Sequence, residues 1–496
     1  MIDPPVRHRW STSFSRATVP ARACASHGAA FMLRLVSLLL SAPTDARAQA
    51  VSVDQAAIRR FVTAAIRADG VPGLSVVVVS RDGTVYAEGF GTTGSEGAPV
   101  TPDTPFALGS MSKSFTALAI MQLVEDGRVD LDATVQQYLP SFATASPEAG
   151  RITVRQLLAH TSGIPTNAAR AEQDGRTLAD HVTVLRGVTL ASAPGAAHEY
   201  ASPNYQILGR IVEVMSGESF GAYVAHHVFA PLGMRRSYVD ADAASSVGLA
   251  SGHQMMFGMV VERDLPFESD RLPTAALMSS ANDLGRFMRM QLRGGELDGI
   301  RVASDLSVAQ MHRPQVQAEG FAYAMGWRLS NIGGAAAVHH GGILPNYRGK
   351  MVMLPGRGLA VVVLTNVSTL IGSPTSHRVA DGIAAIISGQ PPPASPGLPL
   401  RWILVGVGIG MAAITTLQLR GLARAIRATR SVGSAAKEVG FAAALLFGIP
   451  LFTGIGWPEL WRQAPDMVAW MILAATLGVA TGILRLRTGN LHSRPK

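Results

Sequence analysis

A serine and a lysine three residues apart offer the parts of an acylation site. Ser110 and Lys113 lie in Gly109-Ser110-Met111-Ser112-Lys113. At helical spacing such residues share one face, one turn apart, so the two side chains can meet. A serine hydroxyl needs a base to take its proton, and a lysine serves as that base only where burial or another cation lowers its pKa. The pair therefore predicts nucleophilic catalysis if Lys113 is buried, and an ordinary solvated lysine if it is not.

A buried helix is expected directly after this pair. Residues 115–127 form a mainly apolar run that is too long for a strand, and Gly127 is a typical C-terminal stop. Ser110 would then lie at the N-terminal end of the helix, where the helix dipole favours negative charge. The apolar surroundings would also provide the burial that Lys113 needs.

The net charge of +9 is concentrated at the two ends of the chain. Residues 1–48 contain six basic and two acidic side chains, residues 49–400 contain 26 and 29, and residues 401–496 contain 11 and three. The large middle is mildly acidic, so no nucleic-acid partner is expected. The single cysteine, Cys24, excludes an intrachain disulfide framework, and the histidines lack metal-ligand spacing. We therefore expect no metal and no cofactor.

Residues 1–48 have the pattern of an N-terminal extension with a secretory signal peptide. Residues 32–42 combine a positive start with a short apolar core, and Ala46-Arg47-Ala48 follows as a cleavage site. Met32 is an alternative start for the chain. An uncleaved anchor is the other interpretation, because the apolar core is short and the stretch before it is long.

Residues 49–389 have the pattern of a mixed α/β (α+β) domain. The expected elements are a helix at 53–69, strands at 74–79, 84–90, 325–329, 350–354 and 359–365, and a helix at 376–387. A largely helical region separates the early strands from the late ones. This order predicts one sheet assembled from both ends of the domain, with a helical subdomain inserted.

A proline-rich linker at 390–400 precedes a three-helix transmembrane region at 401–496. Three nearly uncharged apolar runs, each about long enough to cross a bilayer, cover 402–417, 441–457 and 467–484. The loop after the first run and the C-terminal tail are rich in arginine and lysine, so both are expected in the cytoplasm. That topology places the 49–389 domain outside, as the signal peptide independently requires. A soluble three-helix bundle would need polar faces that these runs lack.

Three further segments accompany Ser110 and Lys113, in a fixed order along the chain. They are 152–165 with His160-Thr161-Ser162-Gly163, 198–209 with Tyr200-Ala201-Ser202-Pro203-Asn204, and 339–347 with His339-His340-Gly341-Gly342, which precedes an expected strand. Together the motifs resemble the serine β-lactamase and penicillin-binding-protein superfamily. The likeness is greatest to the branch with class C β-lactamases, D-Ala-D-Ala carboxypeptidases, D-aminopeptidases and β-lactamase-like esterases. It covers about residues 55–388 and implies an antiparallel sheet with a helical subdomain.

The resemblance implies a role for each motif residue. Ser110 corresponds to the acylated nucleophile, Lys113 to the base that takes its proton, and Tyr200 to the tyrosine that relays a proton to the leaving group. A tyrosine is a poor base unless a cation stabilises its phenolate, and Lys113 is the candidate cation. The backbone N–H groups of Ser110 and Ile343 correspond to the oxyanion hole, where loss of one donor typically costs about 10²–10³ in rate.

The strand and tyrosine motifs depart from the family pattern at two positions. His340 stands where many members have lysine, with Gly342 leaving room for substrate, and His339 is an alternative one residue earlier. Ser202 occupies the position of an asparagine that contacts the substrate amide, and Asn204 lies two residues further on. These departures favour peptidase or esterase chemistry over a true β-lactamase, and ester cleavage most of all.

Two other motifs have structural interpretations. The His160 segment is interpreted as a helix end that turns at Gly163, without a direct catalytic role for the histidine. Gly217-Glu218-Ser219-Phe220-Gly221 matches the G-x-S-x-G esterase pattern, but a nucleophile elbow needs a strand before it. An amphipathic helix is expected there instead. Taken alone, Tyr200 is better interpreted as an ordinary half-buried tyrosine.

The sequence as a whole predicts an extracytoplasmic, membrane-anchored serine hydrolase that works through a covalent acyl-enzyme. Its expected substrate is a small molecule or peptide, such as a peptidoglycan-derived one, with a β-lactam, a D-Ala-type peptide or a carboxylic ester as the acyl donor. The alternative is a non-catalytic sensor or scaffold that holds a cell-wall peptide in the same pocket. The sequence leaves the acyl donor and the oligomeric state open.

Overall fold

The structure is a computed structural model. It describes residues 53–94, 97–168, 177–369, 375–393, 399–426, 431–453 and 456–487. The expected signal peptide and its cleavage site lie outside the described residues, as do residues 394–398 of the proline-rich linker.

An eight-stranded antiparallel sheet forms the centre of the domain, in the order β10-β11-β12-β13-β14-β15-β1-β2. The strands are β1 (Gly73–Ser80), β2 (Thr84–Gly91), β10 (Val316–Ala318), β11 (Phe321–Tyr323), β12 (Arg328–Ile332), β13 (Ala335–Ile343), β14 (Arg348–Leu354) and β15 (Leu359–Thr365). The early strand β1 pairs with the late strand β15 from Leu74↔Thr365 to Ser80↔Leu359. The expectation of one sheet built from both ends of the domain is therefore confirmed.

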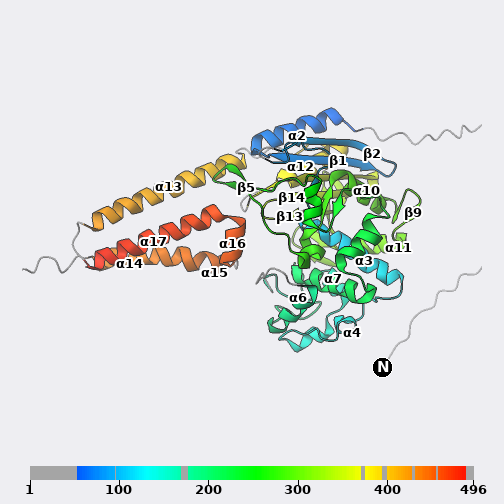
Figure 1. The fold of residues 1–496 in the computed structure, drawn as a ribbon, viewed down its shortest axis with the longest axis horizontal. Coiled ribbons are helices and arrows are strands. Elements are labelled where there is room, and N and C mark those ends of the chain that lie inside the picture. Colours follow the sequence, from blue (N-terminus) through cyan, green and yellow to red (C-terminus); the bar gives the residue numbers. More distant parts are fainter. Residues whose placement is uncertain are drawn as a thin grey trace, which may run out of the picture. The chain divides into compact units, whose positions relative to one another are not determined.

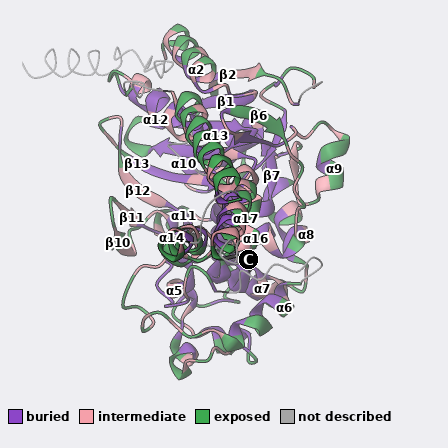
Figure 2. Cartoon of the chain, turned by 90° about the vertical axis from the view of Figure 1, so that its left-hand side faces the viewer, coloured by how far each residue is buried: buried purple, intermediate pink, exposed green. Residues whose placement is uncertain are grey.

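Both faces of this sheet are covered by helices. Strand β1 is buried along its whole length, and its alternating valines serve two cores. Val76 and Val78 pack with α2 (Gln55–Asp69) and α12 (Thr375–Ile387), whereas Val77 and Val79 pack with the core of α3 (Ser112–Glu125) and α10 (Ala281–Leu292). Figure 1 shows α2 and α12 on one side of the sheet and α10 on the other. The buried strands stand out in Figure 2.

A helical region with short strands lies between β2 and β10. Its helices are α4 (Val135–Tyr138), α5 (Val154–Leu158), α6 (Leu178–Val184), α7 (Ser202–Ser216), α8 (Phe220–Val224), α9 (Ala241–Ser246) and α11 (Asp305–Met311). Its short strands are β3 (Pro105–Ala107), β4 (Ser237–Tyr238), β5 (His253–Met256), β6 (Met259–Glu262), β7 (Met278–Ser280), β8 (Glu296–Leu297) and β9 (Ile300–Arg301), and β16 (Val367–Ser368) pairs with β5. The predicted helical insertion is thus present, and it carries α3 and α7 to one end of the sheet.

Most expected elements of the sheet and its helices form where the sequence placed them, with two corrections. Helix α2 ends at Gly70, whose φ of 68° is the left-handed conformation of a C-terminal stop. The strand expected at 325–329 is wrong for its first three residues, which connect β11 to β12. The motif His339-His340-Gly341-Gly342 is expected from the sequence to precede a strand, but it lies inside one, because residues 335–343 form β13. Alanine and glycine give this segment little intrinsic strand preference, so its pairing with β12 and β14 decides its conformation.

Three C-terminal helical segments are long and apolar enough to cross a membrane, at Leu400–Ala425, Val432–Phe452 and Pro465–Leu486. They correspond to α13 (Leu400–Ala425), to α14 (Val432–Ala443) with α15 (Ile449–Thr453), and to α17 (Pro465–Arg487), while the short α16 (Trp457–Gln463) precedes α17. Large apolar side chains of α13 are exposed, such as Ile409 (66%) and Leu417 (60%). Figure 2 shows α13 largely in the colour of exposed residues. A water-soluble helix would instead expose a polar face.

Candidate active site

Ser110 lies on a tight turn at the start of α3, with Lys113 directly beneath it. Residues 109–111 form a single 3-10 turn, and α3 begins at Ser112. The side-chain nitrogen of Lys113 lies 3.3 Å from Ser110 Oγ and donates a hydrogen bond to the backbone oxygen of Thr274 at 3.0 Å. The structure therefore brings together the two residues that the sequence paired by spacing.

Lys113 is fully buried, and its surroundings favour the neutral amine. Desolvation lowers the pKa of Lys113, and the nearby cations Arg271 and Arg328 lower it further, while Tyr200 acts in the opposite direction. The nitrogen lies 5.0 Å from the centre of the Tyr200 ring. An amine that is neutral near physiological pH can accept a proton from a serine hydroxyl.

Tyr200 stands in the loop just before α7, with its hydroxyl inside the site. Its side chain is half-buried, and its buried Oη makes no close hydrogen bond among the described residues, although it interacts with the amine of Lys113. The ring packs against His160, with 4.3 Å between ring centres, and lies 6.1 Å from Tyr323 and 6.4 Å from His340. A buried hydroxyl without a close hydrogen bond is available to a substrate atom or to a transferred proton.

The turn of Ser110 lies directly against strand β13. A Cβ atom on Gly342 would lie 1.8 Å from the backbone oxygen of Leu108, and one on Gly109 would lie 2.6 Å from the backbone nitrogen of Ile343. Gly109 also has a φ of 55°, in the left-handed region that favours glycine. Two glycines thus permit the close approach that brings the backbone of Ser110 next to that of Ile343. This is the arrangement that a two-amide oxyanion hole requires.

His340, rather than His339, shares the face of β13 that carries Gly342. Nε2 of the His340 ring lies 3.3 Å from Tyr323 Oη, and Nδ1 lies 2.7 Å from the backbone oxygen of Gly341. Burial lowers the pKa of His340 well below the usual range, and Arg328 and Lys113 add to that effect. His340 is therefore neutral, unlike the lysine found at this position in other members. His339 points to the opposite face and lies 3.0 Å from Ser330 Oγ.

The two polar residues after Tyr200 have different surroundings. Ser202 is exposed at the first position of α7. Asn204 is fully buried, accepts a hydrogen bond from Ser162 Oγ at 2.7 Å, and places its amide nitrogen 3.1 Å from His160 Nδ1. Ser162 and His160 thus occupy both ends of the Asn204 amide. Asn204 therefore does not take over the substrate contact that an asparagine at position 202 would make.

Arg328 of β12 is a site residue that the sequence reasoning missed. Its guanidinium lies 5.5 Å from the centre of the Tyr200 ring and 4.5 Å from that of Phe321. Its Nε is buried without a partner, and no carboxylate of the described residues forms an ion pair with it. A single arginine among the apolar and small residues 321–329 was the available signal. Arg328 is the first residue of β12 and pairs with His339, and only the tertiary structure shows that its guanidinium reaches Tyr200.

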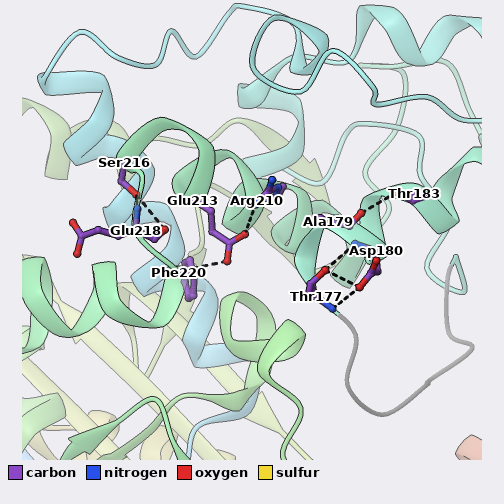
Figure 3. Close-up of polar contacts among 9 residues, drawn as sticks. All are labelled: Thr177, Ala179, Asp180, Thr183, Arg210, Glu213, Ser216, Glu218 and Phe220. Atoms are coloured by element: carbon purple, nitrogen blue, oxygen red, sulfur yellow. Dashed lines mark hydrogen bonds and ion pairs between the residues drawn. The ribbon is translucent and has the colours of Figure 1, made fainter.

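The G-x-S-x-G match at 217–221 is a structural corner between α7 and α8. Helix α7 precedes it, and Gly217 adopts a left-handed φ of 81°. Figure 3 shows Glu213 accepting hydrogen bonds from Arg210 (2.9 Å) and from the backbone of Phe220 (3.3 Å). Ser219 accepts a hydrogen bond from the backbone of Ala222 as the N-terminal cap of α8. No strand leads into this serine, so it lacks the geometry of a nucleophile elbow.

Comparison with known proteins gives matches over the part of the chain that contains this site. Residues 58–385 match the family model described as Beta-lactamase. Penicillin-binding protein 4 of Amycolatopsis lactamdurans is 34% identical over 314 residues, which cover 60% of this chain and 81% of that protein. Protein flp of Staphylococcus aureus (strain MW2) is 27% identical over 304 residues, and the match spans 60% of each chain. The family match includes the sheet and the helical insertion around Ser110.

A solved structure has the same fold. The octameric penicillin-binding protein homologue from Pyrococcus abyssi superposes with a TM-score of 0.61 at 28% sequence identity. The superposition covers 73% of this chain and 81% of that chain. The antiparallel sheet with inserted helices is therefore shared at the level of three-dimensional structure as well as sequence.

Proposed function

Because this chain belongs to the beta-lactamase family, we propose that it is a serine hydrolase that works through a covalent acyl-enzyme. The observation that carries the proposal is the 3.3 Å distance between Ser110 Oγ and the nitrogen of a fully buried lysine, Lys113. A structural lysine would gain nothing from burial beside a serine hydroxyl, because desolvating the amine is costly. A base for the serine needs that environment.

The proposed reaction has two steps. In the first, Ser110 Oγ attacks the carbonyl carbon while Lys113 takes the hydroxyl proton, and the N–H groups of Ser110 and Ile343 hold the oxyanion. The proton then passes through Tyr200 to the leaving group as its bond to the carbonyl breaks. In the second, water attacks the acyl-enzyme and releases the acid, and the proton returns to Ser110. The lowered pKa of Lys113 and the buried Tyr200 hydroxyl support this assignment.

The surroundings of Tyr200 support an acyl donor that carries a carboxylate. Arg328 is a half-buried cation beside the reacting groups, and an anionic substrate group would satisfy it. β-Lactams and D-Ala-terminated peptides carry a carboxylate near the scissile amide, whereas simple alkyl esters do not. Ser202 removes the amide contact that would favour these substrates, so an ester remains the competing class.

We further propose that the hydrolase domain lies on the extracytoplasmic side of a membrane. The three apolar C-terminal helices support membrane association, and the basic loop after α13 supports a cytoplasmic position for that loop. A non-catalytic sensor for a cell-wall peptide is the second candidate. The exposed Ser202 favours it, because a site without the amide contact is less suited to cleaving a peptide.

The test is intact-mass spectrometry of the full chain in detergent after incubation with a fluorophosphonate, a penicillin and a p-nitrophenyl ester. Ser110→Ala is the active-site variant, and Ser219→Ala, which removes the serine of the G-x-S-x-G match, is the control. An adduct that disappears only in Ser110→Ala supports the hydrolase. Turnover of the penicillin or the ester supports the hydrolase further, whereas folded protein without adduct or turnover contradicts the serine hydrolase and favours the sensor.

A further inference from the structure

His160 follows α5 in a conformation that few residues of its type adopt. Its φ is 57°, in the left-handed region, and it is fully buried. Glycine adopts this conformation at no steric cost, whereas it is uncommon for every other residue type, although asparagine, aspartate and histidine adopt it more often than the rest. A histidine at such a position needs a reason beyond ending a helix, since glycine would end it with less strain.

The conformation lets His160 bind the chain on both sides of Tyr200. The backbone N–H of Glu199 donates to the carbonyl oxygen of His160 at 2.8 Å. The backbone N–H of Ala201 donates to His160 Nδ1 at 3.2 Å. One residue thus holds the amides directly before and directly after Tyr200. Among the described residues, no other single residue accepts hydrogen bonds from both of these backbone amides.

The imidazole of His160 is itself held in one orientation. Its Nδ1 accepts from Ala201, so Nδ1 carries no proton and the neutral ring bears its hydrogen on Nε2. The Asn204 amide lies 3.1 Å from the same Nδ1, and Ser162 holds the other end of Asn204. Burial, together with the charges of Lys113 and the neighbouring histidines, keeps the pKa of His160 well below its usual range, so the acceptor persists at neutral pH.

Tyr200 depends on such support because it belongs to no helix or strand. The residues from 188 to 201 form a loop that leads into α7. The Tyr200 hydroxyl makes no close hydrogen bond among the described atoms, so the backbone of 199–201 and the ring contacts help to decide where Oη stands. Thr166 Oγ1 also donates a hydrogen bond to the Tyr200 backbone oxygen, at 2.9 Å. The His160 ring supplies one of those contacts, 4.3 Å from the Tyr200 ring.

We propose that His160 is a positioning residue that holds the backbone and ring of Tyr200 so that its hydroxyl stands between Lys113 and the leaving group. Asn204 orients the imidazole and acts through His160. This inference rests on the proposed hydrolase function and deepens it. It assigns a role to the His160-Thr161-Ser162-Gly163 motif that the reaction itself does not use. Since His160 contacts no reacting atom, its loss should lower kcat and leave KM nearly unchanged.

The experiment compares two substitutions that both accept the left-handed backbone. His160→Gly removes the acceptor without adding strain, whereas His160→Asn keeps a side-chain oxygen close to the position of Nδ1. The full chain, in detergent, is assayed with whichever acyl donor labels Ser110 in the wild type. We expect His160→Gly to lower kcat by about tenfold or more, within the 10²–10⁴-fold that general acid–base catalysis typically contributes. His160→Asn should recover most of the loss.

A second comparison separates positioning from a general loss of structure. Asp298→Gly changes another non-glycine residue with a left-handed φ (51°), far along the chain from this site, and should leave kcat unchanged. In a Tyr200→Phe background, His160→Gly should cost little more, because the hydroxyl that it positions is already absent. If His160→Gly does not fold, Asn204→Ala replaces it, with a smaller fall in kcat expected.

The outcomes are distinct. Equal kcat for His160→Gly and the wild type, or a full additional loss in the Tyr200→Phe background, overturns the positioning role. The positioning role is also overturned if His160→Asn melts at the same temperature as the wild type but has a kcat as low as that of His160→Gly. Failure of wild-type Ser110 to form any adduct would instead refute the proposed hydrolase.

Discussion

Lys113 sets the expected pH dependence at the scale of single residues. Because burial lowers the pKa of Lys113 in the folded chain, the neutral base is present at lower pH than for an ordinary lysine. We expect kcat/KM to rise with pH through that lowered pKa. The unfolded chain binds more protons between the two pKa values, so the free energy of unfolding should also rise with pH in that window. A pH series of acylation rates and denaturant titrations measures both.

Substitution of Lys113 tests the same assignment. Arginine does not deprotonate in proteins, so Lys113→Arg keeps the charge and loses the base. We expect a fall in the acylation rate of about 10²–10⁴-fold. An acylation rate within threefold of the wild type would contradict the role of Lys113. Lys350→Arg, which changes a lysine paired with Asp381, is the matched control.

Arg328 is expected to decide between charged and neutral acyl donors. Arg328→Ala removes a half-buried cation 5.5 Å from the Tyr200 ring centre. A hydrogen bond to a charged group is worth about 1.5–3 kcal/mol, so KM for carboxylate-bearing substrates should rise by roughly 10–100-fold. Neutral esters should show little change in KM. The comparison of both substrates on both proteins is the measurement, and an equal change for the two classes would argue against carboxylate binding.

At the scale of elements, the approach of β13 to the turn of Ser110 depends on glycine. Gly342→Ala would place a Cβ atom 1.8 Å from the backbone oxygen of Leu108, so strand and turn must separate. We expect the acylation rate to fall by about 10²–10³-fold, the usual cost of an oxyanion donor. Gly356→Ala is the control, because a Cβ atom there meets open space. Stopped-flow acylation with melting temperatures distinguishes loss of the oxyanion hole from loss of the fold.

At the scale of the whole molecule, the proposed topology predicts which residues are reached from outside. In a Cys24→Ser background, Ser245→Cys lies on exposed α9 of the hydrolase domain, and Arg424→Cys lies near the end of α13. In cells with a permeabilised outer envelope, a membrane-impermeant maleimide should label Ser245→Cys at once. It should label Arg424→Cys only after the membrane is disrupted. The reverse pattern would invert the topology.

Local pattern was sufficient for much of the fold. The valine-rich β1, the helix that ends at Gly70 and the three apolar C-terminal helices each follow from periodicity over a short stretch. The spacing of Ser110 and Lys113 also fixes their proximity, because one helical turn brings them together wherever the helix lies. The order of the motifs was enough to indicate the family.

Other features depended on segments far apart in the sequence. Strand β13 forms in an alanine- and glycine-rich segment because β12 and β14 pair with it. The guanidinium of Arg328, at the start of β12, reaches the ring of Tyr200 from a distant part of the chain. Asn204 turns inward because Ser162 Oγ donates a hydrogen bond to its amide oxygen and its amide nitrogen lies beside Nδ1 of His160, 44 residues earlier. The sequence by itself determined the helices and strands with a strong local pattern and which residues could react. Only the tertiary structure decided which side chains surround them, because hydrogen bonds and burial between distant segments leave no periodic trace in the chain.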